Sequence, residues 1–218
     1  MPESASFSVR PKPNYRRRRT FTVLVLLAVA VIVVALLSRG GGGTKKGEPG
    51  TPTMAFASTV TNVPQQKAPD AGTATANGDA VVKMFNDYYQ VGFVDPHKWG
   101  DGTFKDLQAL FVKEANTSFT GDINSLTIGE ARTELKRVDP QPSTLTVTVY
   151  YDAAAKPTFA VAAATFVATG TLKQAGPALI IQQKATYYLQ KFGDAWTIIS
   201  YDAHQTQQTP TPSPSPSS

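Results

Sequence analysis

The sequence contains no cysteine and only two histidines, His97 and His204. The absence of cysteine excludes disulfides, thiol catalysis and cysteine-based metal sites, so the folded part must depend on its hydrophobic core. Two histidines are too few for a histidine-rich metal centre. We therefore expect neither a metal site nor a cofactor, and no residue stands out as catalytic.

Acidic residues are scarce in the first 50 positions. Residues 1–19 carry a net charge of +5 and residues 20–50 carry +2, which leaves −2 for residues 51–218. The high isoelectric point therefore belongs to the N-terminal part and not to the region that folds. This distribution removes the electrostatic argument for nucleic-acid binding, and we expect no nucleic-acid partner.

One long hydrophobic run, from Phe21 to Leu37, contains no charged residue, proline or glycine. As a helix it spans about 26 Å, and with Thr20 and Ser38 it reaches across a hydrocarbon core of about 30 Å. More positive charge precedes the run than follows it, so the positive-inside rule predicts a cytoplasmic N-terminus and an extracytoplasmic domain. Four consecutive arginines before the run are expected to contact anionic lipid headgroups: Arg16, Arg17, Arg18 and Arg19.

A cleaved signal peptide is the alternative interpretation of this run. The run is longer than the apolar region of an ordinary signal peptide, and no small-x-small cleavage site follows it. We therefore favour an uncleaved, single-pass anchor in the cytoplasmic membrane. Either interpretation places the folded domain outside the cytoplasm.

The composition divides the chain into five parts. We expect a disordered basic cytoplasmic tail over residues 1–19, a transmembrane helix over 20–38, a flexible linker over 39–76 and a folded domain over 77–203. Residues 204–218 are expected to form a disordered tail rich in Pro, Ser and Thr, because prolines at alternate positions favour an extended chain without a core.

Apolar residues recur with helical spacing in the first half of the folded region. The pattern predicts a helix that begins at Asn77 or Asp79 and ends near Gly92, and a short helix over residues 103–112. A third helical segment is predicted from Thr127, with the spacing of a capping box, and it includes Leu135 and Val138.

From Ser143 onward the apolar pattern changes to strict alternation. The alternation predicts strands over residues 144–151, 158–172, 178–192 and 196–202, joined by short turns. Helices that precede antiparallel strands indicate the α+β class. We expect three N-terminal helices packed on one face of a curved four-stranded antiparallel sheet, preceded by the transmembrane helix.

Three segments resemble the NTF2-like superfamily, also called the cystatin-like cone fold. They are the helix with the paired Tyr88 and Tyr89, the stretch Leu126-Thr127-Ile128-Gly129, and the closing hairpin from Tyr187 to Ile198. With a basic tail and one membrane anchor in front, the layout is similar to actinobacterial Mce-associated and VirB8-like membrane proteins. The resemblance implies a cone-shaped domain and an accessory role in a cell-envelope transport or secretion assembly.

The same resemblance directs the search for a site. Enzymes of this superfamily use an Asp or His inside the cone as general acid or base, which makes Asp95 and His97 candidates. An Asp-Pro-His sequence after a helix is, however, also typical of a simple turn. Aromatic side chains are candidates for contacts with a ligand or partner, or for the core: Tyr88, Tyr89, Tyr187, Trp196 and Tyr201.

The main hypothesis is a non-enzymatic, membrane-anchored scaffold that pairs with itself or with other envelope proteins. The small side chains at residues 144, 146 and 148 and at 160, 162 and 164 permit close sheet packing, and the alternative is that they merely accommodate the helices. The alternatives are a binding module for a small apolar or lipid ligand within the cone, and a lyase or isomerase of the polyketide-cyclase type. A filled cone with an apolar outer sheet face favours the scaffold, a roomy apolar cavity the binding module, and inward acid–base groups the enzyme.

Overall fold

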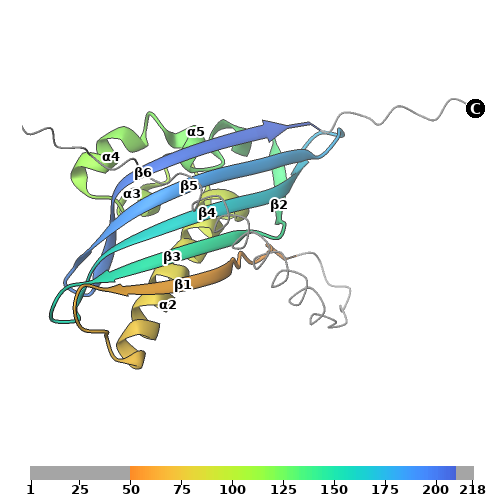
Figure 1. Ribbon diagram of the computed structural model, residues 1–218. Coiled ribbons are helices and arrows are strands. Elements are labelled where there is room, and N and C mark those ends of the chain that lie inside the picture. The colour runs from red at the N-terminus through yellow and green to blue at the C-terminus, as the bar shows by residue number, and fades with distance from the viewer. Residues whose placement is uncertain (1–49, 210–218) are drawn as a thin grey trace, which may run out of the picture. The chain divides into compact units, whose positions relative to one another are not determined.

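The computed structural model describes residues 50–209, which form an α+β domain (Figure 1). The first half contains one strand followed by helices, and the second half contains the remaining strands. In chain order the elements are β1 (Ala57–Pro64), α2 (Ala71–Tyr89), η2 (Gln90–Val94), η3 (Pro96–Lys98), α3 (Lys105–Gln108), α4 (Lys113–Phe119), α5 (Ile123–Leu126), η4 (Gly129–Thr133), β2 (Leu135–Pro140), β3 (Thr144–Tyr151), β4 (Pro157–Leu172), β5 (Leu179–Phe192) and β6 (Ala195–Gln208).

The sheet has six strands, and its main path runs β1-β3-β4-β5-β6. The β3, β4, β5 and β6 neighbours are antiparallel, β2 pairs with the end of β4, and β1 pairs with β3 in parallel. The long helix α2 lies across the inner face of the sheet (Figure 1). This arrangement confirms the α+β class and helices on one face of the sheet, as the resemblance to the NTF2-like superfamily implied.

The three central strands agree closely with the sequence prediction. Strand β3 has the predicted bounds, and β4 and β5 each differ from prediction by one residue. Leu145, Val147 and Val149 face the core, as the alternation indicated. The small residues Ala160, Ala162 and Ala164 are also buried, so on this face of β4 they make room for α2 instead of offering a surface for sheet packing.

The structure corrects the predicted linker over residues 50–76. This stretch contains strand β1 and the first turn of α2, and Met54 and Phe56 are buried in the core with 3% and 7% of their surface exposed. The backbone N–H of Met54 donates to Gln90 Oε1 (2.7 Å), and that of Phe56 donates to Asn86 Oδ1 (3.0 Å). The side-chain amides of Asn86 on α2 and Gln90 on η2 thus bind the backbone of this segment and hold it against the domain.

Helix α2 begins earlier than predicted. Asp70 caps it by accepting from the backbone N–H of Thr73 (2.8 Å), and the helix already includes Asn77 and Asp79 as interior residues. The helix ends close to the predicted position, where Asp95 and Pro96 follow one π-helical turn. The first turn was missed because its residues are small and polar and show no apolar periodicity.

The third predicted helix is wrong over its second half. A short 3-10 turn, η4, covers Gly129–Thr133, but Leu135 and Val138 belong to strand β2. The pairing of β2 with β4 shifts by one residue between Leu135 and Arg137. This bulge places Leu135 and Val138 on the same buried face at a spacing of three residues, and the same spacing is typical of a helix.

Two further boundaries differ from prediction. The second helix is limited to Lys105–Gln108, and α4, which the sequence pattern did not indicate, follows at Lys113–Phe119. Strand β6 continues to Gln208, so residues 204–208 are part of the sheet and not of a tail. The sheet therefore has six strands instead of four, and it is mixed because β1 is parallel to β3.

The predicted transmembrane segment, the basic tail and residues 39–49 lie outside the described residues, as do residues 210–218 of the C-terminal tail. Within residues 50–209, no helix is long and apolar enough to cross a membrane.

Candidate functional site

Three of the predicted site residues meet between α2 and the sheet, and we call them the tyrosine cluster: Tyr88, Tyr89 and Tyr187. The ring centroids of Tyr88 and Tyr89 are 5.4 Å apart, and those of Tyr88 and Tyr187 are 5.6 Å apart. All three side chains are fully buried. Further rings pack around them, with Phe85 4.8 Å from Tyr187 and Phe166 5.2 Å from Tyr89. The interior at this level is therefore filled by aromatic side chains.

Polar groups inside the tyrosine cluster are mostly paired. The Tyr88 hydroxyl donates to the backbone carbonyl of Leu126 (2.7 Å), and the Tyr89 hydroxyl donates to Gln183 Oε1. Gln183, which is also buried, donates through Nε2 to the carbonyl of Ser125. The Tyr187 hydroxyl has no hydrogen-bond partner among the described residues. The sequence gave no signal for Gln183, because a glutamine in an alternating strand is usually exposed.

Burial determines the protonation of the tyrosine cluster. It raises the pKa of Tyr88 and Tyr89 well above the ordinary value for a phenol, and it raises the pKa of Tyr187 to about 12. All three phenols are therefore neutral at physiological pH. A phenol with such a raised pKa is a poor general base near pH 7, where catalysis favours a pKa close to the working pH.

Tyr201 lies apart from the tyrosine cluster. Its ring packs edge-on against Phe111 (5.7 Å), and its hydroxyl donates to Asp122 Oδ2 (2.8 Å). Partial burial, followed by the hydrogen bond to the Asp122 carboxylate, raises the pKa of Tyr201. These contacts fasten β6 to the turn before α5, so Tyr201 has a structural role at this edge of the sheet.

Asp95 and His97 form the turn that the sequence allowed as an alternative. Asp95 Oδ1 accepts from the backbone N–H of His97 (3.0 Å) and caps the short helix η3, while the His97 side chain is exposed. Within residues 50–209, no hydrogen bond or ion pair joins the side chain of either residue to the tyrosine cluster. Elsewhere in that range, no three His, Asp or Glu side chains gather closely enough to hold a metal ion.

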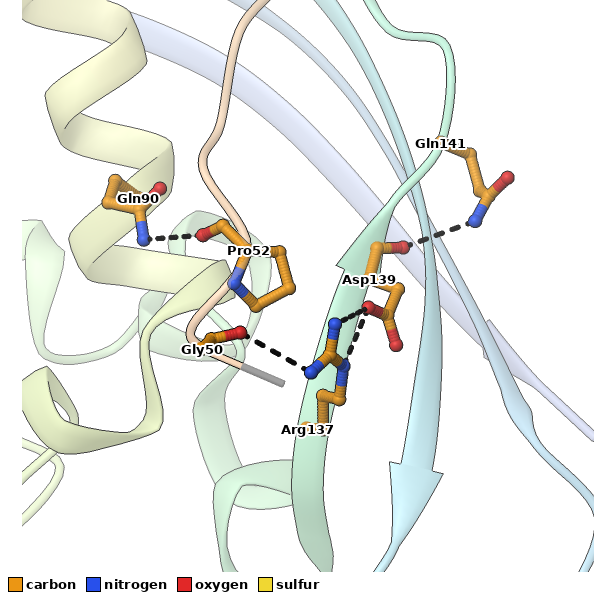
Figure 2. Close-up of polar contacts among 6 residues, drawn as sticks. All are labelled: Gly50, Pro52, Gln90, Arg137, Asp139 and Gln141. Atoms are coloured by element: carbon orange, nitrogen blue, oxygen red, sulfur yellow. Dashed lines mark hydrogen bonds and ion pairs between the residues drawn. The ribbon is translucent and has the colours of Figure 1, made fainter. Parts of the chain in front are cut away.

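His97 instead lines a surface depression next to the start of the described chain, together with Gly50, Pro52 and Arg137. Figure 2 shows how this region is held. Arg137 Nε and Nη2 each lie 2.7 Å from Asp139 Oδ1, and Arg137 Nη1 donates to the carbonyl of Gly50 (3.3 Å). On the other side Gln90 Nε2 donates to the carbonyl of Pro52 (3.0 Å). Strand β2 and the π-helical turn η2 thus hold residues 50–52 between them.

Trp196 is nearly buried at the other end of the sheet, where it contacts a lysine. Lys191 Nζ lies 5.2 Å from the centroid of the Trp196 ring and donates to Asn77 Oδ1 on α2 (2.7 Å). The lysine therefore links the β5–β6 hairpin to the helix through an amide and an aromatic face. Trp196 covers the end of the core, as a plugging residue would, and its indole N–H has no partner among the described residues.

The opposite face of the sheet carries few charged side chains, a property that the sequence pattern predicted only in part. We call the outward positions of β1, β3, β4, β5 and β6 the outer face. Lys184, Asp202 and His204 are the only Asp, Glu, Lys, Arg or His side chains at these positions. They lie close together, because Lys184 pairs with His204 across the strands and His204 Nε2 is 3.2 Å from Asp202 Oδ1. The remainder of the outer face carries no charge.

Aromatic side chains form a row across one end of the outer face. Tyr150 on β3 lies 5.7 Å from Phe159 on β4, and Phe159 lies 6.4 Å from Tyr188 on β5, measured between ring centroids. Val63 on β1 is the cross-strand neighbour of Tyr150 and extends the row. Tyr150 and Tyr188 are each 38% exposed. Contiguous exposed apolar side chains, together with few charges, are typical of a surface that binds another protein.

Comparisons with known proteins give little further information. No protein-family model matches the chain, and no curated protein matches it. One solved structure, described as a "Putative Scytalone Dehydratase" from Novosphingobium aromaticivorans DSM 12444, shares 14% sequence identity at a TM-score of 0.43. The match covers 64% of this chain and 91% of that chain. A likeness of this degree carries no argument about activity.

Proposed function

We propose that the protein is a non-enzymatic scaffold whose domain pairs with a second copy through the outer face. The observation that carries this proposal is the contrast between the two faces of the sheet. The inner face is filled by the tyrosine cluster and its neighbours, whereas the outer face is exposed, nearly uncharged and crossed by the aromatic row. A filled cone, with an outer face that is nearly uncharged and carries exposed aromatic side chains at one end, is what we expect of such a scaffold.

The size of the outer face supports pairing of this kind. Five strands about 4.8 Å apart and about eight residues long present roughly 600 Å² per protomer. A twofold pair then buries about 1,200 Å², which lies at the lower end of specific protein interfaces. Twofold pairing also brings identical surfaces together, and a surface with few charges has little like-charge repulsion to overcome.

The setting of this scaffold is also part of the proposal. The apolar run from Phe21 to Leu37, with the arginines before it, supports a single-pass anchor in the cytoplasmic membrane and an extracytoplasmic domain. The arginines contact anionic lipid headgroups on the inner leaflet. The resemblance to Mce-associated and VirB8-like proteins then suggests an accessory subunit of an envelope transport or secretion assembly.

The test is the oligomeric state of the full chain, purified in detergent and measured by light scattering and native mass spectrometry. We expect a dimer. Ala163 is exposed near the middle of β4, and Ala163→Glu places a charge on the outer face of each copy. This variant should weaken dimerisation at least tenfold. The matched control is Ala76→Glu on the exposed side of α2, which should leave the dimer intact. A monomeric wild type, or a dimer insensitive to Ala163→Glu, would refute the proposal.

A ligand-binding module is the second candidate, and one observation favours it. The Tyr187 hydroxyl is fully buried and makes no well-aligned hydrogen bond within the described residues, although the polar groups of Tyr88, Tyr89 and Gln183 lie next to it. A ligand with a hydrogen-bonding group would therefore satisfy it only if the packed rings moved apart. The probe is phenol, titrated against the full chain with the unfolding temperature as readout. A saturable rise that Tyr187→Phe removes would support a binding module. No rise would leave the scaffold as the sole candidate. A lyase or isomerase finds no support in the tyrosine cluster, whose phenols are neutral, or in the neighbouring amide of Gln183.

A further inference from the structure

Strand β1 presents an open backbone edge. The N–H of Ala57 donates to the carbonyl of Ser143 (2.9 Å), and that of Gln65 donates to the carbonyl of Tyr151 (3.0 Å). Because bonded residues alternate along a parallel ladder, Ser58, Val60 and Asn62 turn their amides and carbonyls away from β3. Within residues 50–209 none of these backbone groups has a hydrogen-bond partner. Three unpaired donors and their carbonyls therefore line the edge of the sheet.

Most features that commonly protect an edge strand are absent from this one, and proline occurs only at its last position, Pro64. Strand β1 contains no charged residue, and its ladder with β3 has no bulge over its eight residues. The opposite edge is different, because Ile198 on β6 exchanges two backbone hydrogen bonds with the segment Leu110–Val112. Strand β2, which within residues 50–209 pairs only with β4, also has a free edge, but it contains Lys136, Arg137 and Asp139 and has a bulge. Beyond Ile198, β6 carries Asp202 and His204. Of these edge strands, β1 is thus the one best suited to receive another strand.

Helix α2 reaches beyond the β1 edge of the sheet. It crosses the inner side of β1 near its middle, where a Cβ added to Gly78 would lie 2.6 Å from Val60 Cγ1. The helix turns before Gly78 continue past β1 (Figure 1). Residues 71–76 of these turns are small, and none of them is buried. A strand added to β1 would find this part of α2 beneath it, so its inner side chains would be covered.

The position of α2 also limits what can occupy the edge. In a twofold β1–β1 pair centred on Val60, both copies of α2 would cross the seam at the same point and collide. The chain's own C-terminal stretch is unsuitable, because its alternate prolines cannot donate to a ladder. The glycine-rich stretch over residues 40–43 has low strand propensity.

We infer that the β1 edge binds an extended, uncharged strand supplied by a different protein, in the mode called β-strand addition. The strand's backbone pairs with Ser58, Val60 and Asn62, and these bonds provide the affinity. The side chains that the bound strand should carry follow from the residues of β1. Thr59 and Thr61 on the outer side favour threonine and β-branched residues opposite them. This inference is independent of outer-face pairing, since edge and face are different surfaces.

The test uses the full chain in detergent and a short synthetic peptide of alternating threonine and valine, with a lysine and a fluorophore at its ends. We expect saturable binding by fluorescence anisotropy. Hydrogen exchange at the amides of Ser58, Val60 and Asn62 should slow at least tenfold with peptide, while exchange at Thr59 and Thr61 stays unchanged. The same peptide with every residue N-methylated, which has no backbone donor on either edge, should not bind.

A matched pair of variants tests whether the peptide binds at the β1 edge and not at another surface. Ser58→Pro removes one outward donor but none of the β1–β3 bonds, and it should weaken peptide binding at least tenfold. Ser58→Ala removes the same side chain and keeps the amide, so it should bind as wild type does. Equal binding by Ser58→Pro, or no saturable binding, would overturn the inference. Because the chain lacks cysteine, disulfide-linked dimers of Val60→Cys would also overturn it by showing a second copy at the edge.

Discussion

The hydroxyl of Tyr89 on α2 donates a hydrogen bond to the side-chain carbonyl of Gln183 on β5, at a separation of 94 positions in the chain. Gln183 passes the connection on, because its amide donates to the carbonyl of Ser125 in α5. One buried glutamine therefore joins the long helix, the central sheet and the short helices near β6. In an otherwise largely apolar interior, these two hydrogen bonds connect α2, β5 and α5.

Replacement of Gln183 should be strongly destabilising. Gln183→Met keeps the volume but leaves the Tyr89 hydroxyl and the Ser125 carbonyl without partners, and each buried unsatisfied group costs about 1–3 kcal/mol. We expect a loss of about 2–4 kcal/mol in the free energy of unfolding. Urea unfolding followed by near-UV circular dichroism measures it. Gln182→Met, at the exposed neighbouring position, is the control and should change stability by less than about 0.5 kcal/mol.

Removal of the Tyr187 hydroxyl, in contrast to replacement of Gln183, should not destabilise the domain. This group is buried without a partner among the described residues, so Tyr187→Phe removes an unsatisfied polar atom and keeps the ring contacts. We expect unfolding free energy unchanged or increased by up to about 1 kcal/mol. The same urea experiment checks this, and a loss above about 1 kcal/mol would show that the hydroxyl is paired in solution.

Truncation of Met54 tests the segment that sequence reasoning assigned to a linker. Met54 is 3% exposed, so Met54→Ala should lower the free energy of unfolding by about 2–4 kcal/mol, as for other buried methionines. Thr53→Ala, at the exposed neighbouring position, should have little effect. Thermal unfolding of the two variants gives the comparison. Equal unfolding temperatures would mean that residues 50–56 do not pack on the domain.

Stability should fall at alkaline pH because of the tyrosine cluster. The pKa of each of its members is higher in the folded state than the value of about 10 in an unfolded chain. Their contribution is therefore complete below about pH 10 and is lost as the pH rises through the range from about 10 to 12. Each tyrosine adds a slope of about 1.4 kcal/mol per pH unit in that range.

Urea unfolding at a series of pH values, with tyrosinate absorbance recorded in parallel, measures this dependence. The three buried phenols should ionise only as the domain unfolds. Tyr187→Phe should reduce the slope of stability against pH above pH 10, because one titrating group is removed. Ionisation of all tyrosines in the folded state would contradict the burial of the cluster.

The strands that could be predicted are those whose burial alternates locally. Along β3, β4 and β5 most inward residues are apolar and most outward residues are small, polar or aromatic, so the period is visible in the sequence despite exceptions such as Gln183. Strand β1 has Val60 as its one sizeable apolar residue on the inner side. It is held in the sheet by backbone pairing with β3, which lies far away in the chain. Strand β2 was mistaken because its bulge imitates helical spacing.

The residues of the candidate site were likewise only partly predictable from the sequence. Tyr88 and Tyr89 were suggested by helical spacing, and Tyr187 by alternation, so their meeting in the core could be anticipated from pattern alone. Their partner Gln183 could not, because only the three-dimensional contact with Tyr89 explains a buried amide on β5. The uncharged outer face was likewise invisible until the register assigned each residue to a face.

The parallel pairing of β1 with β3 also sets an order of events during synthesis. Tyr151, the residue of β3 that pairs with Pro64 at the far end of the ladder, emerges from the ribosome long after β1 does. At about 5–20 residues per second, the intervening chain takes roughly 4–17 seconds to make. Throughout that interval β1 is an uncharged strand with both edges open, so we expect newly made chains to depend on chaperones until β3 arrives.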